Sequence, residues 1–289
     1  MTSWADVRAF SKTLIAGSLA GVVADVATHP LSTVKTRLQV QGAAMGGKEI
    51  ARYAGPLHAL GSVASKEGVS ALYKGLGITV AGAAPAQGLY FAGYDLFRAV
   101  LGRTDPATNF LAGNFAQLCG SLVWVPMDTI KERLQIEGQL ARVAEPLGTS
   151  ARALRLILRK EGVRGLYPAY WVHQATWAPF NGLFFALYEY VNEWTAQRRL
   201  PSWPSAIIAA TIAGTVTNPM DVVKTRLQVV RASPHLFQYT GVFHCAASIA
   251  KTEGVRVFFD GAFARCLLQA PRLALALAVK DALQIHVFK

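Results

Sequence analysis

The chain has 289 residues, of which 52% are hydrophobic and 16% charged, and its formal net charge is +12. This balance is too apolar for an ordinary soluble basic protein and is typical of a membrane protein. The basic residues are dispersed through the connecting segments and do not gather with interleaved aromatic residues, so the charge does not indicate nucleic-acid binding. Polar residues such as Asp25, Gln117 and Arg272 interrupt the apolar segments. We therefore expect helices that share a polar interior.

One pattern, Pro-x-(Ser or Asp)-x-x-Lys-x-Arg-Leu-Gln, occurs three times, beginning at Pro30, Pro126 and Pro219. Each copy is followed by a Glu-Gly pair and then by a short motif that begins with an aromatic residue. Two motifs in a fixed order, three times over, predict a protein built from internal repeats. The later motifs are Glu67-Gly68 with Tyr73-Lys-Gly75, Glu161-Gly162 with Tyr167-Pro-Ala169, and Glu253-Gly254 with Phe258-Phe-Asp-Gly261.

Each repeat predicts an apolar helix that contains the proline motif, a polar segment with a short amphipathic helix ahead of Glu-Gly, and a second apolar helix. A proline inside a helix removes a backbone hydrogen bond and bends the helix. Pro30, Pro126 and Pro219 should therefore draw three helix ends together into a closed floor. In chain order, the apolar helices are expected at 12–38, 76–98, 108–134, 170–192, 204–227 and 262–284.

These motifs closely resemble those of the mitochondrial carrier family, and the resemblance covers nearly the whole chain. It implies an all-α membrane protein with six transmembrane helices in three homologous repeats, 1–103, 104–199 and 200–289, which form one transmembrane domain with threefold pseudosymmetry. Three short amphipathic helices would lie on the matrix side. The resemblance also implies a monomer in the mitochondrial inner membrane, with both termini toward the intermembrane space and cardiolipin as a lipid partner.

The resemblance further implies solute transport by alternating access between two gates. The sequence contains no nucleophile–base pairing, no GxGxxG after a strand and no cluster with metal-ligand spacing. We therefore expect a transporter and not an enzyme, with no cofactor, no bound metal and no nucleic-acid partner.

The matrix gate is expected from charges inside the helices, because a charge in hydrocarbon is costly unless it is paired. In the family's arrangement, the acid of one odd-numbered helix pairs with the base of the next. This rule pairs Asp128 with Lys224 and Asp221 with Lys35. Three glutamines match the family's braces, which hydrogen-bond across these pairs: Gln39, Gln135 and Gln228.

The first repeat departs from the gate pattern. It carries Ser32 where the other two copies have an acid. By the same pairing rule, Lys131 should meet the Ser32 hydroxyl and lack a carboxylate partner. The matrix gate would then hold two ion pairs of a possible three.

The opposite, cytoplasmic gate resembles the family's motif of an aromatic residue, an acid and a base four positions on. The first copy is complete, the second has lost its base, and the third has lost both its aromatic residue and its base. Only Asp281 with Arg98 remains as a full ion pair, so this gate should be the weaker one. Its expected residues are Asp95, Arg98, Glu189, Asn192, Asp281 and Gln284.

The family's substrate contact points lie on the even-numbered helices, and none of them is charged here, which argues against a highly anionic substrate. Asp25, Arg272, Arg265 and His173 lie near these points and are further candidates, although a structural hydrogen bond explains Arg265 and His173 equally well. Arginine binds carboxylates in a bidentate manner, so one carboxylate facing guanidinium groups favours an amino-acid-like or small carboxylate metabolite. The contact points are Gly82, Ala83, Thr176, Trp177, Leu268 and Gln269.

Other functions of the same fold stay open. The segment from Gly82 to Tyr90, together with Gln269, looks similar to the iron-carrying members, but among the residues expected to face the cavity only His173 offers a ligand suited to iron. Trp177 is suited to stacking on a base, so a nucleoside-containing cofactor is a further candidate substrate. A proton-leak or uncoupling protein and a receptor or scaffold without transport are the remaining alternatives.

Overall fold

The structure, a computed structural model, describes residues 4–42, 53–102, 106–140, 146–198, 203–229, 239–269, 271–272 and 275. This part of the chain is mostly helical and contains no strand. Its elements follow the three repeats. The first contains α1 (Trp4–Val40), α2 (Pro56–Glu67), the 3-10 helix η1 (Val69–Tyr73) and α3 (Leu76–Leu101).

The second repeat contains α4 (Pro106–Gln135), α5 (Glu137–Leu140), α6 (Ser150–Glu161), η2 (Val163–Leu166) and α7 (Tyr170–Gln197). The third contains α8 (Trp203–Val216), α9 (Asn218–Val229), α10 (Val242–Thr252) and η4 (Val255–Phe259), followed by helical residues at 262–269, 271–272 and 275. The first four expected apolar helices are confirmed with changes of boundary, and the fifth is present as two helices, α8 and α9. Most of the sixth, expected at 262–284, lies outside the described residues.

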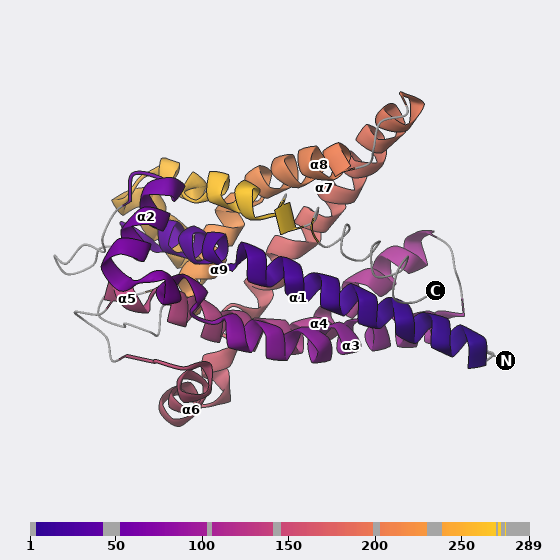
Figure 1. Cartoon of the computed structure of the whole chain (residues 1–289), viewed down its shortest axis with the longest axis horizontal. Helices are drawn as coiled ribbons and strands as arrows, with labels where there is room; N and C mark the ends of the chain where they lie inside the picture. Colours follow the sequence, from indigo (N-terminus) through magenta and orange to yellow (C-terminus); the bar gives the residue numbers. More distant parts are fainter. Residues whose placement is uncertain are drawn as a thin grey trace.

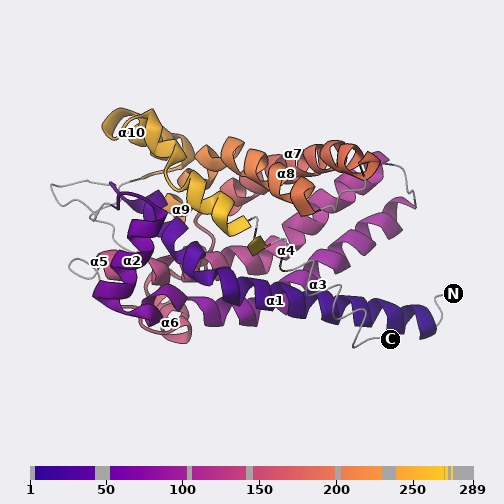
Figure 2. The ribbon, with the colours of Figure 1, turned by 45° about the horizontal axis from the view of Figure 1, so that its top comes forward.

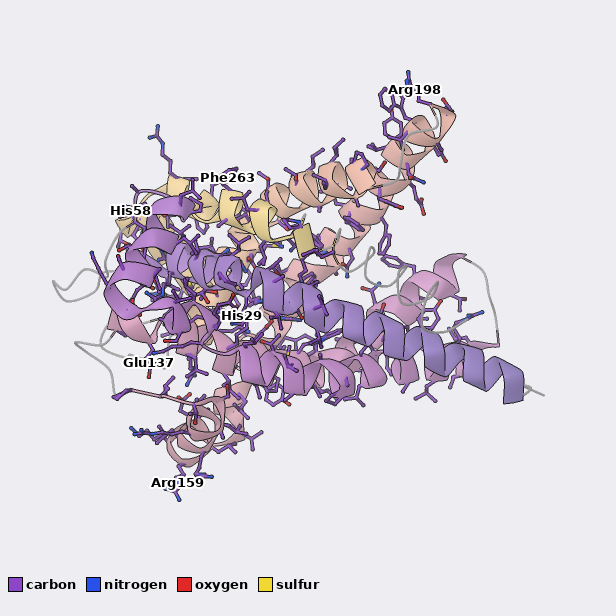
Figure 3. The ribbon with its side chains drawn as sticks, viewed as in Figure 1. His29, His58, Glu137, Arg159, Arg198 and Phe263 are labelled. Carbon is purple, nitrogen blue, oxygen red and sulfur yellow. The ribbon has the colours of Figure 1, made fainter. Side chains whose placement is uncertain are left out.

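The long helices run side by side along the long axis of the molecule, and the short helices gather at one end of it (Figures 1 and 2). This is the end at which α1 finishes, and α2, α5 and α6 surround it. His58, Glu137 and Arg159 lie there, whereas Arg198 lies at the far end of α7 and His29 lies toward the middle of the bundle (Figure 3). The proline motifs therefore sit next to the short helices.

The Glu-Gly motif ends each short helix or directly follows it, as the sequence predicts. Gly68, Gly162 and Gly254 have φ angles of 87°, 67° and 89°. L-residues with a side chain rarely adopt this conformation, so glycine is the residue that lets the chain turn there. The turn leads into the 3-10 helix and then into the second long helix of the repeat.

The prolines act differently in the three odd-numbered helices. α1 and α4 continue through Pro30 and Pro126. The third helix is divided at Thr217 into α8 and α9, whose axes differ by 64°. Pro219 has no N–H to donate to the preceding turn, and its ring crowds that turn. The predicted bend is thus confirmed as a break in the third repeat.

Polar and apolar side chains are distributed in the opposite way to that of a soluble protein. Arg37, Arg133 and Arg226 are among the largest fully buried side chains, whereas Trp171 and Tyr190 are 75% and 76% exposed. An apolar exterior around a polar interior suits a helical bundle in lipid. The described segment Phe110–Gln135 is long and apolar enough to cross a membrane by itself, and the bent pair Pro204–Val216 and Asn218–Val229 passes the same test jointly.

Three small hydrophobic cores hold the short helices in place, one for each repeat. In the first, Val34 and Leu38 of α1 pack against Ala59 and Val63 of α2. The second joins α4 to α6, and the third joins α9 to α10 and the start of α7. Each core lies beside a proline motif and packs the short helix of a repeat against the long helix that carries the motif.

A buried arginine in each proline motif binds the glutamate of the Glu-Gly motif in the same repeat. The two terminal guanidinium nitrogens, Nη1 and Nη2, each contact one oxygen of the carboxylate, a bidentate geometry that arginine favours. In the second repeat, Arg133 Nη1 lies 2.5 Å from Glu161 Oε1 and Nη2 lies 3.0 Å from Oε2. The three pairs are Arg37–Glu67, Arg133–Glu161 and Arg226–Glu253.

The same arginines also join each repeat to the next one. The remaining guanidinium nitrogen, Nε, donates to the backbone carbonyl of the glutamine that ends the next proline motif. Because the third arginine reaches back to the first repeat, the three contacts close a ring. Arg37 Nε donates to Gln135 O at 2.8 Å, Arg133 Nε to Gln228 O at 3.1 Å, and Arg226 Nε to Gln39 O at 3.0 Å.

Breaking one link of this ring should destabilise the whole bundle. Arg226→Gln removes a fully buried guanidinium and leaves the Glu253 carboxylate without its cation, which typically costs about 3–5 kcal/mol. We expect a clearly lower melting temperature for the purified protein in detergent. The double variant Arg226→Gln with Glu253→Gln leaves no lone buried charge and should melt above the single variant. An unchanged melting temperature for Arg226→Gln would show that the ring does not hold the repeats together.

Candidate functional site

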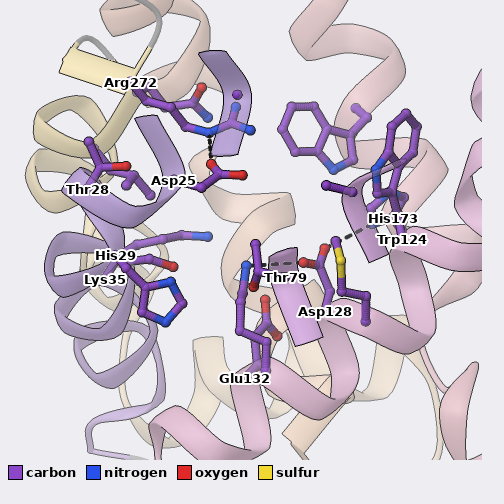
Figure 4. A pocket seen from close by; sticks show the side chains of 18 of the residues that line it. Asp25, Thr28, His29, Lys35, Thr79, Trp124, Asp128, Glu132, His173 and Arg272 are labelled. Atoms are coloured by element: carbon purple, nitrogen blue, oxygen red, sulfur yellow. Dashed lines mark hydrogen bonds and ion pairs between the residues drawn. The ribbon is translucent and has the colours of Figure 1, made fainter. Parts of the chain in front are cut away.

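A cavity of about 700 Å³ occupies the centre of the bundle. Its described wall is formed by α1, α3, α4, α7 and α9 and by residues between 265 and 272. Figure 4 shows Asp25 and Arg272 on one side of it, with Trp124 and His173 across from them and Asp128 and Glu132 on the floor. Such a volume matches the sites that proteins use for small molecules.

The floor of the cavity contains the two ion pairs that the sequence predicts. Lys35 Nζ lies 2.6 Å from Asp221 Oδ2, and Lys224 Nζ lies 3.4 Å from Asp128 Oδ2. Each pair joins two different repeats, α1 to α9 and α9 to α4. Their side chains are 4% to 14% exposed. The charges therefore close the floor and neutralise one another in a nearly dry environment.

The prediction that Lys131 meets the Ser32 hydroxyl is wrong. Lys131 Nζ lies 3.2 Å from Asp128 Oδ1, one helical turn earlier on α4. Gln135 Nε2 lies 3.3 Å from Ser32 Oγ and takes the place expected for the lysine. A carboxylate with a full charge attracts an ammonium more strongly than a neutral hydroxyl does. Lys131 thus has a carboxylate partner after all.

The three glutamines of the proline motifs are fully buried and contact the floor in different ways. Gln39 donates to Asp221 Oδ2 at 2.9 Å and so braces the Lys35–Asp221 pair, as expected. Gln135 contacts Ser32, and the Gln228 amide lies 2.6 Å from Glu132 Oε2.

The sequence reasoning missed Glu132, a buried carboxylate on the cavity floor. Its signal was present as a break in the repeat. The position between lysine and arginine of the motif holds threonine in the first and third copies, Thr36 and Thr225, and glutamate in the second. Lys224 Nζ lies 3.8 Å from Glu132 Oε1, so the carboxylate belongs to the charge network of the floor.

Asp25 and Arg272 form an ion pair at the side of the cavity. Arg272 Nε donates to Asp25 Oδ1 at 2.5 Å and joins the first repeat to the last helix. The Arg272 side chain is 42% exposed and that of Asp25 is 18% exposed. This pair is therefore more accessible than the ion pairs of the floor, and a solute in the cavity can reach it.

Most of the expected substrate contact points lie on the cavity wall, together with His173: Ala83, Trp177, Leu268 and Gln269. Gly82 and Thr176 are not among its lining residues, and their contact with a substrate stays a prediction. A Cβ atom on Gly82 would approach Met127 Sδ to 2.6 Å, so this glycine serves close helix packing. Thr176 is buried, and its hydroxyl donates to Val172 O.

The expected cytoplasmic gate is only partly described. Asp95 and Glu189 are exposed, and Arg98 lies with its guanidinium 5.7 Å from the centre of the Tyr94 ring. Asn192 is half-buried. The remaining gate residues, Asp281 and Gln284, lie outside the described residues, so the pairing of Asp281 with Arg98 stays a prediction.

Beside the floor, a further ion pair links the first two repeats. Lys74 of the aromatic motif binds Glu137 of α5, and Gly148 N donates to Glu137 Oε1 at 2.8 Å. Burial by itself raises the pKa of the Glu137 carboxyl, but these contacts outweigh it and hold the pKa below its ordinary value. The link therefore stays ionised at neutral pH.

Comparison with known proteins assigns the family. The family model described as mitochondrial carrier protein matches the chain three times, at residues 6–105, 102–199 and 200–289. The chain belongs to the mitochondrial carrier family. Proteins of this family are transporters and not enzymes, and their normal location is the mitochondrial inner membrane.

Three relatives extend the comparison. Mitochondrial substrate carrier family protein E of Dictyostelium discoideum is 35% identical over 96% of this carrier and 95% of its own length. S-adenosylmethionine carrier 1, chloroplastic/mitochondrial, of Arabidopsis thaliana is 33% identical over 90% of this chain and 74% of its own. Mitochondrial glutamate carrier 1 of Homo sapiens is 28% identical over 92% and 91%.

The geometry of the floor predicts which side of the carrier admits reagents in the absence of substrate. Single cysteines at Gln269, on the cavity wall, and at Gln228, in the buried floor, are introduced after the native cysteines are replaced. In mitoplasts, whose outer surface faces the former intermembrane space, a membrane-impermeant thiol reagent should label the first cysteine and spare the second. If the reagent instead spares the cysteine at 269, the resting carrier is closed on this side and open to the matrix.

Proposed function

We propose that this carrier moves a small amino-acid-like or other carboxylate metabolite across the mitochondrial inner membrane by alternating access. The ion pairs of the floor act as the matrix gate in this proposal, and Asp95, Arg98 and their counterparts act as the cytoplasmic gate. The protein is a monomer with six membrane spans, both termini toward the intermembrane space and the short helices on the matrix side, where cardiolipin binds. α3, α7 and α1 have 26, 28 and 37 residues, and at 1.5 Å per residue each exceeds the ~30 Å hydrocarbon core.

The Asp25–Arg272 pair carries the proposal for the substrate. The two charges of this pair neutralise each other. A zwitterion offers an ammonium group to Asp25 and a carboxylate to Arg272, so it replaces one ion pair by two. A neutral solute offers no such exchange and leaves both charges poorly compensated. Arginine adds bidentate recognition of the carboxylate.

The overall charge of the cavity supports the same substrate class. Among its described lining residues, five are Lys or Arg and four are Asp or Glu. This near balance disfavours a solute with several charges of one sign, because such a solute would leave part of its charge uncompensated. The named substrates of two relatives, glutamate and S-adenosylmethionine, both contain an amino-acid group.

A nucleoside-containing solute is the second candidate, because aromatic residues line the cavity opposite Asp25. Trp124, Trp177 and Phe91 all lie on its wall. Aromatic rings stack on bases, and each stacked base contributes about 1–3 kcal/mol. S-adenosylmethionine combines a nucleoside with an amino-acid group and would use both sides of the cavity.

Transport of iron or a simple proton leak has less support. The described residues contain no group of three or more His, Cys, Asp or Glu side chains arranged to hold a metal ion. A proton leak needs no cavity of this volume and no ion pair exposed at its side.

The proposal predicts that Asp25→Asn and Arg272→Ala, made separately, each reduce solute uptake at least tenfold. Each change removes one partner of a zwitterion and leaves the other charge without compensation, which raises the free energy of the loaded state. The measurement is initial uptake of radiolabelled L-glutamate and S-adenosylmethionine into proteoliposomes. Folding is checked by melting temperature, which should change little because the pair is partly exposed.

Matched controls are Glu193→Gln and Arg198→Ala on the exposed end of α7, which should transport normally. Normal uptake by both Asp25→Asn and Arg272→Ala would remove the basis for the zwitterion. A thermal-shift screen against a metabolite panel complements the test, because a ligand that binds the folded state raises its apparent stability.

A further inference from the structure

The residue that follows the lysine of the proline motif is a threonine in the first and third repeats, and there it joins its repeat to the next one through a buried hydrogen bond. Thr36 Oγ1 donates to Gln135 Oε1 at 2.7 Å, and Thr225 Oγ1 donates to Gln39 Oε1 at 2.8 Å. The threonine of one repeat thus donates to the glutamine of the following repeat. Both oxygen atoms are buried, so their contact is favourable only because the threonine hydroxyl supplies a hydrogen for the hydrogen bond.

The second repeat has a carboxyl group at this position. The Gln228 amide lies 2.6 Å from Glu132 Oε2 and 3.2 Å from Oε1 when its nitrogen donates to an ionised carboxylate. A half-turn of the amide brings its oxygen to the same place, where it accepts a hydrogen bond from the O–H of a neutral carboxyl group. The neutral form reproduces the hydrogen bond of Thr36 and Thr225. The Gln228 amide can therefore hydrogen-bond to Glu132 whether the carboxyl group is ionised or neutral.

Nearby charges compensate Glu132 less than they compensate the other two acids of the floor. Asp221 has Lys35 at 2.6 Å, and Asp128 has Lys131 at 3.2 Å. Among the described residues, the cation within 4 Å of Glu132 is Lys224, whose Nζ lies 3.8 Å from Glu132 Oε1.

Lys224 is itself shared by three carboxylates. It lies 3.4 Å from Asp128 and 3.9 Å from Asp221, closer to the first than to Glu132. When several carboxylates share one site, the least compensated one takes up a proton first. The other charged groups that face this part of the floor are Lys35 from α1, Asp128 and Lys131 from α4 and Arg265 from the last helix, and the titratable imidazole of His173 faces it from α7.

Glu132 also lies where a proton can reach it. Its side chain is buried in the floor, yet it forms part of the cavity wall. Opening of the matrix gate must separate α4 from α9, because Lys224 links them. The same movement takes Lys224 and Gln228 away from Glu132 and exposes the carboxyl group to water on the matrix side.

We propose that Glu132 is a proton-binding site that couples proton movement to solute transport by this carrier. With the gate closed, a hydronium ion in the cavity transfers a proton to a Glu132 carboxylate oxygen: one O–H bond of the hydronium ion breaks, one forms on the carboxyl group, and neutral water is left. The neutral group no longer holds Lys224, so the gate opens more easily. On the matrix side water stabilises the carboxylate, the O–H bond breaks and the proton passes to water. The inference rests on the proposed function, because coupling requires a transported solute.

The test measures accumulation against a proton gradient. Proteoliposomes with valinomycin and equal potassium on both sides hold the membrane potential at zero, and radiolabelled L-glutamate or S-adenosylmethionine is the probe. With the outside one pH unit more acidic, one proton per solute should raise the final inside-to-outside ratio about tenfold. Glu132→Gln and Glu132→Thr should leave the ratio near one. Glu193→Gln, the exposed control, should keep the full ratio.

The final ratio does not depend on the transport rate, so slow variants remain informative. No uptake of any probe by the unaltered carrier would contradict the proposed function. Uptake by the unaltered carrier that ignores the pH gradient would overturn the coupling alone, as would an unchanged ratio in both Glu132 variants.

A second measurement needs no substrate. The infrared C=O stretch of a neutral carboxyl group should be present in the carrier at neutral pH and missing from Glu132→Gln and Glu132→Thr. Glu132→Thr restores the hydroxyl found in the other repeats and should fold with an unchanged melting temperature. A spectrum in which both variants keep the band of the unaltered carrier would overturn the assignment of the proton to Glu132.

Discussion

The ring of three buried arginines is the constraint on which the rest of the structure depends. Each guanidinium holds the glutamate of its own repeat and the glutamine carbonyl of the next repeat. Arginine suits this place because its rigid fork satisfies a carboxylate with two nitrogens and leaves a third for the carbonyl. Those carbonyls belong to residues whose side chains reach the cavity floor. The ring therefore sets the register in which the gate charges meet.

The interior is stable because its charges occur in mutually compensating sets. A lone buried charge costs several kcal/mol, and attraction between partners offsets this cost only at good geometry. The Lys35–Asp221 pair meets that condition at 2.6 Å, with Gln39 as a brace. Lys224, by contrast, is shared among three acids at 3.4 to 3.9 Å. The floor thus combines one firm contact with one that is loosely divided, and the loosely divided contact gives way at a lower energetic cost.

The threefold pattern makes departures from it informative. Ser32 replaces an acid and Glu132 replaces a threonine, so one repeat has lost a charge and the next has gained one. A symmetric floor would treat a solute alike from three sides. The asymmetric one places an additional carboxylate, Glu132 of α4, beside Lys224 of α9.

The sequence by itself determined the three repeats, the helices and the turns at Glu-Gly, because backbone preference and helical periodicity are local properties. The resemblance to the mitochondrial carrier family gave the pairs Lys35–Asp221 and Lys224–Asp128, because the family's arrangement specifies which helices meet. Only the tertiary structure decided that Lys131 binds Asp128, that Glu132 faces Gln228, and that Gly82 packs closely against Met127. A side chain's partner is settled by competition among all the groups within about 4 Å. Those groups come from several helices, and the spacing of residues along one helix does not specify how the helices are placed relative to one another.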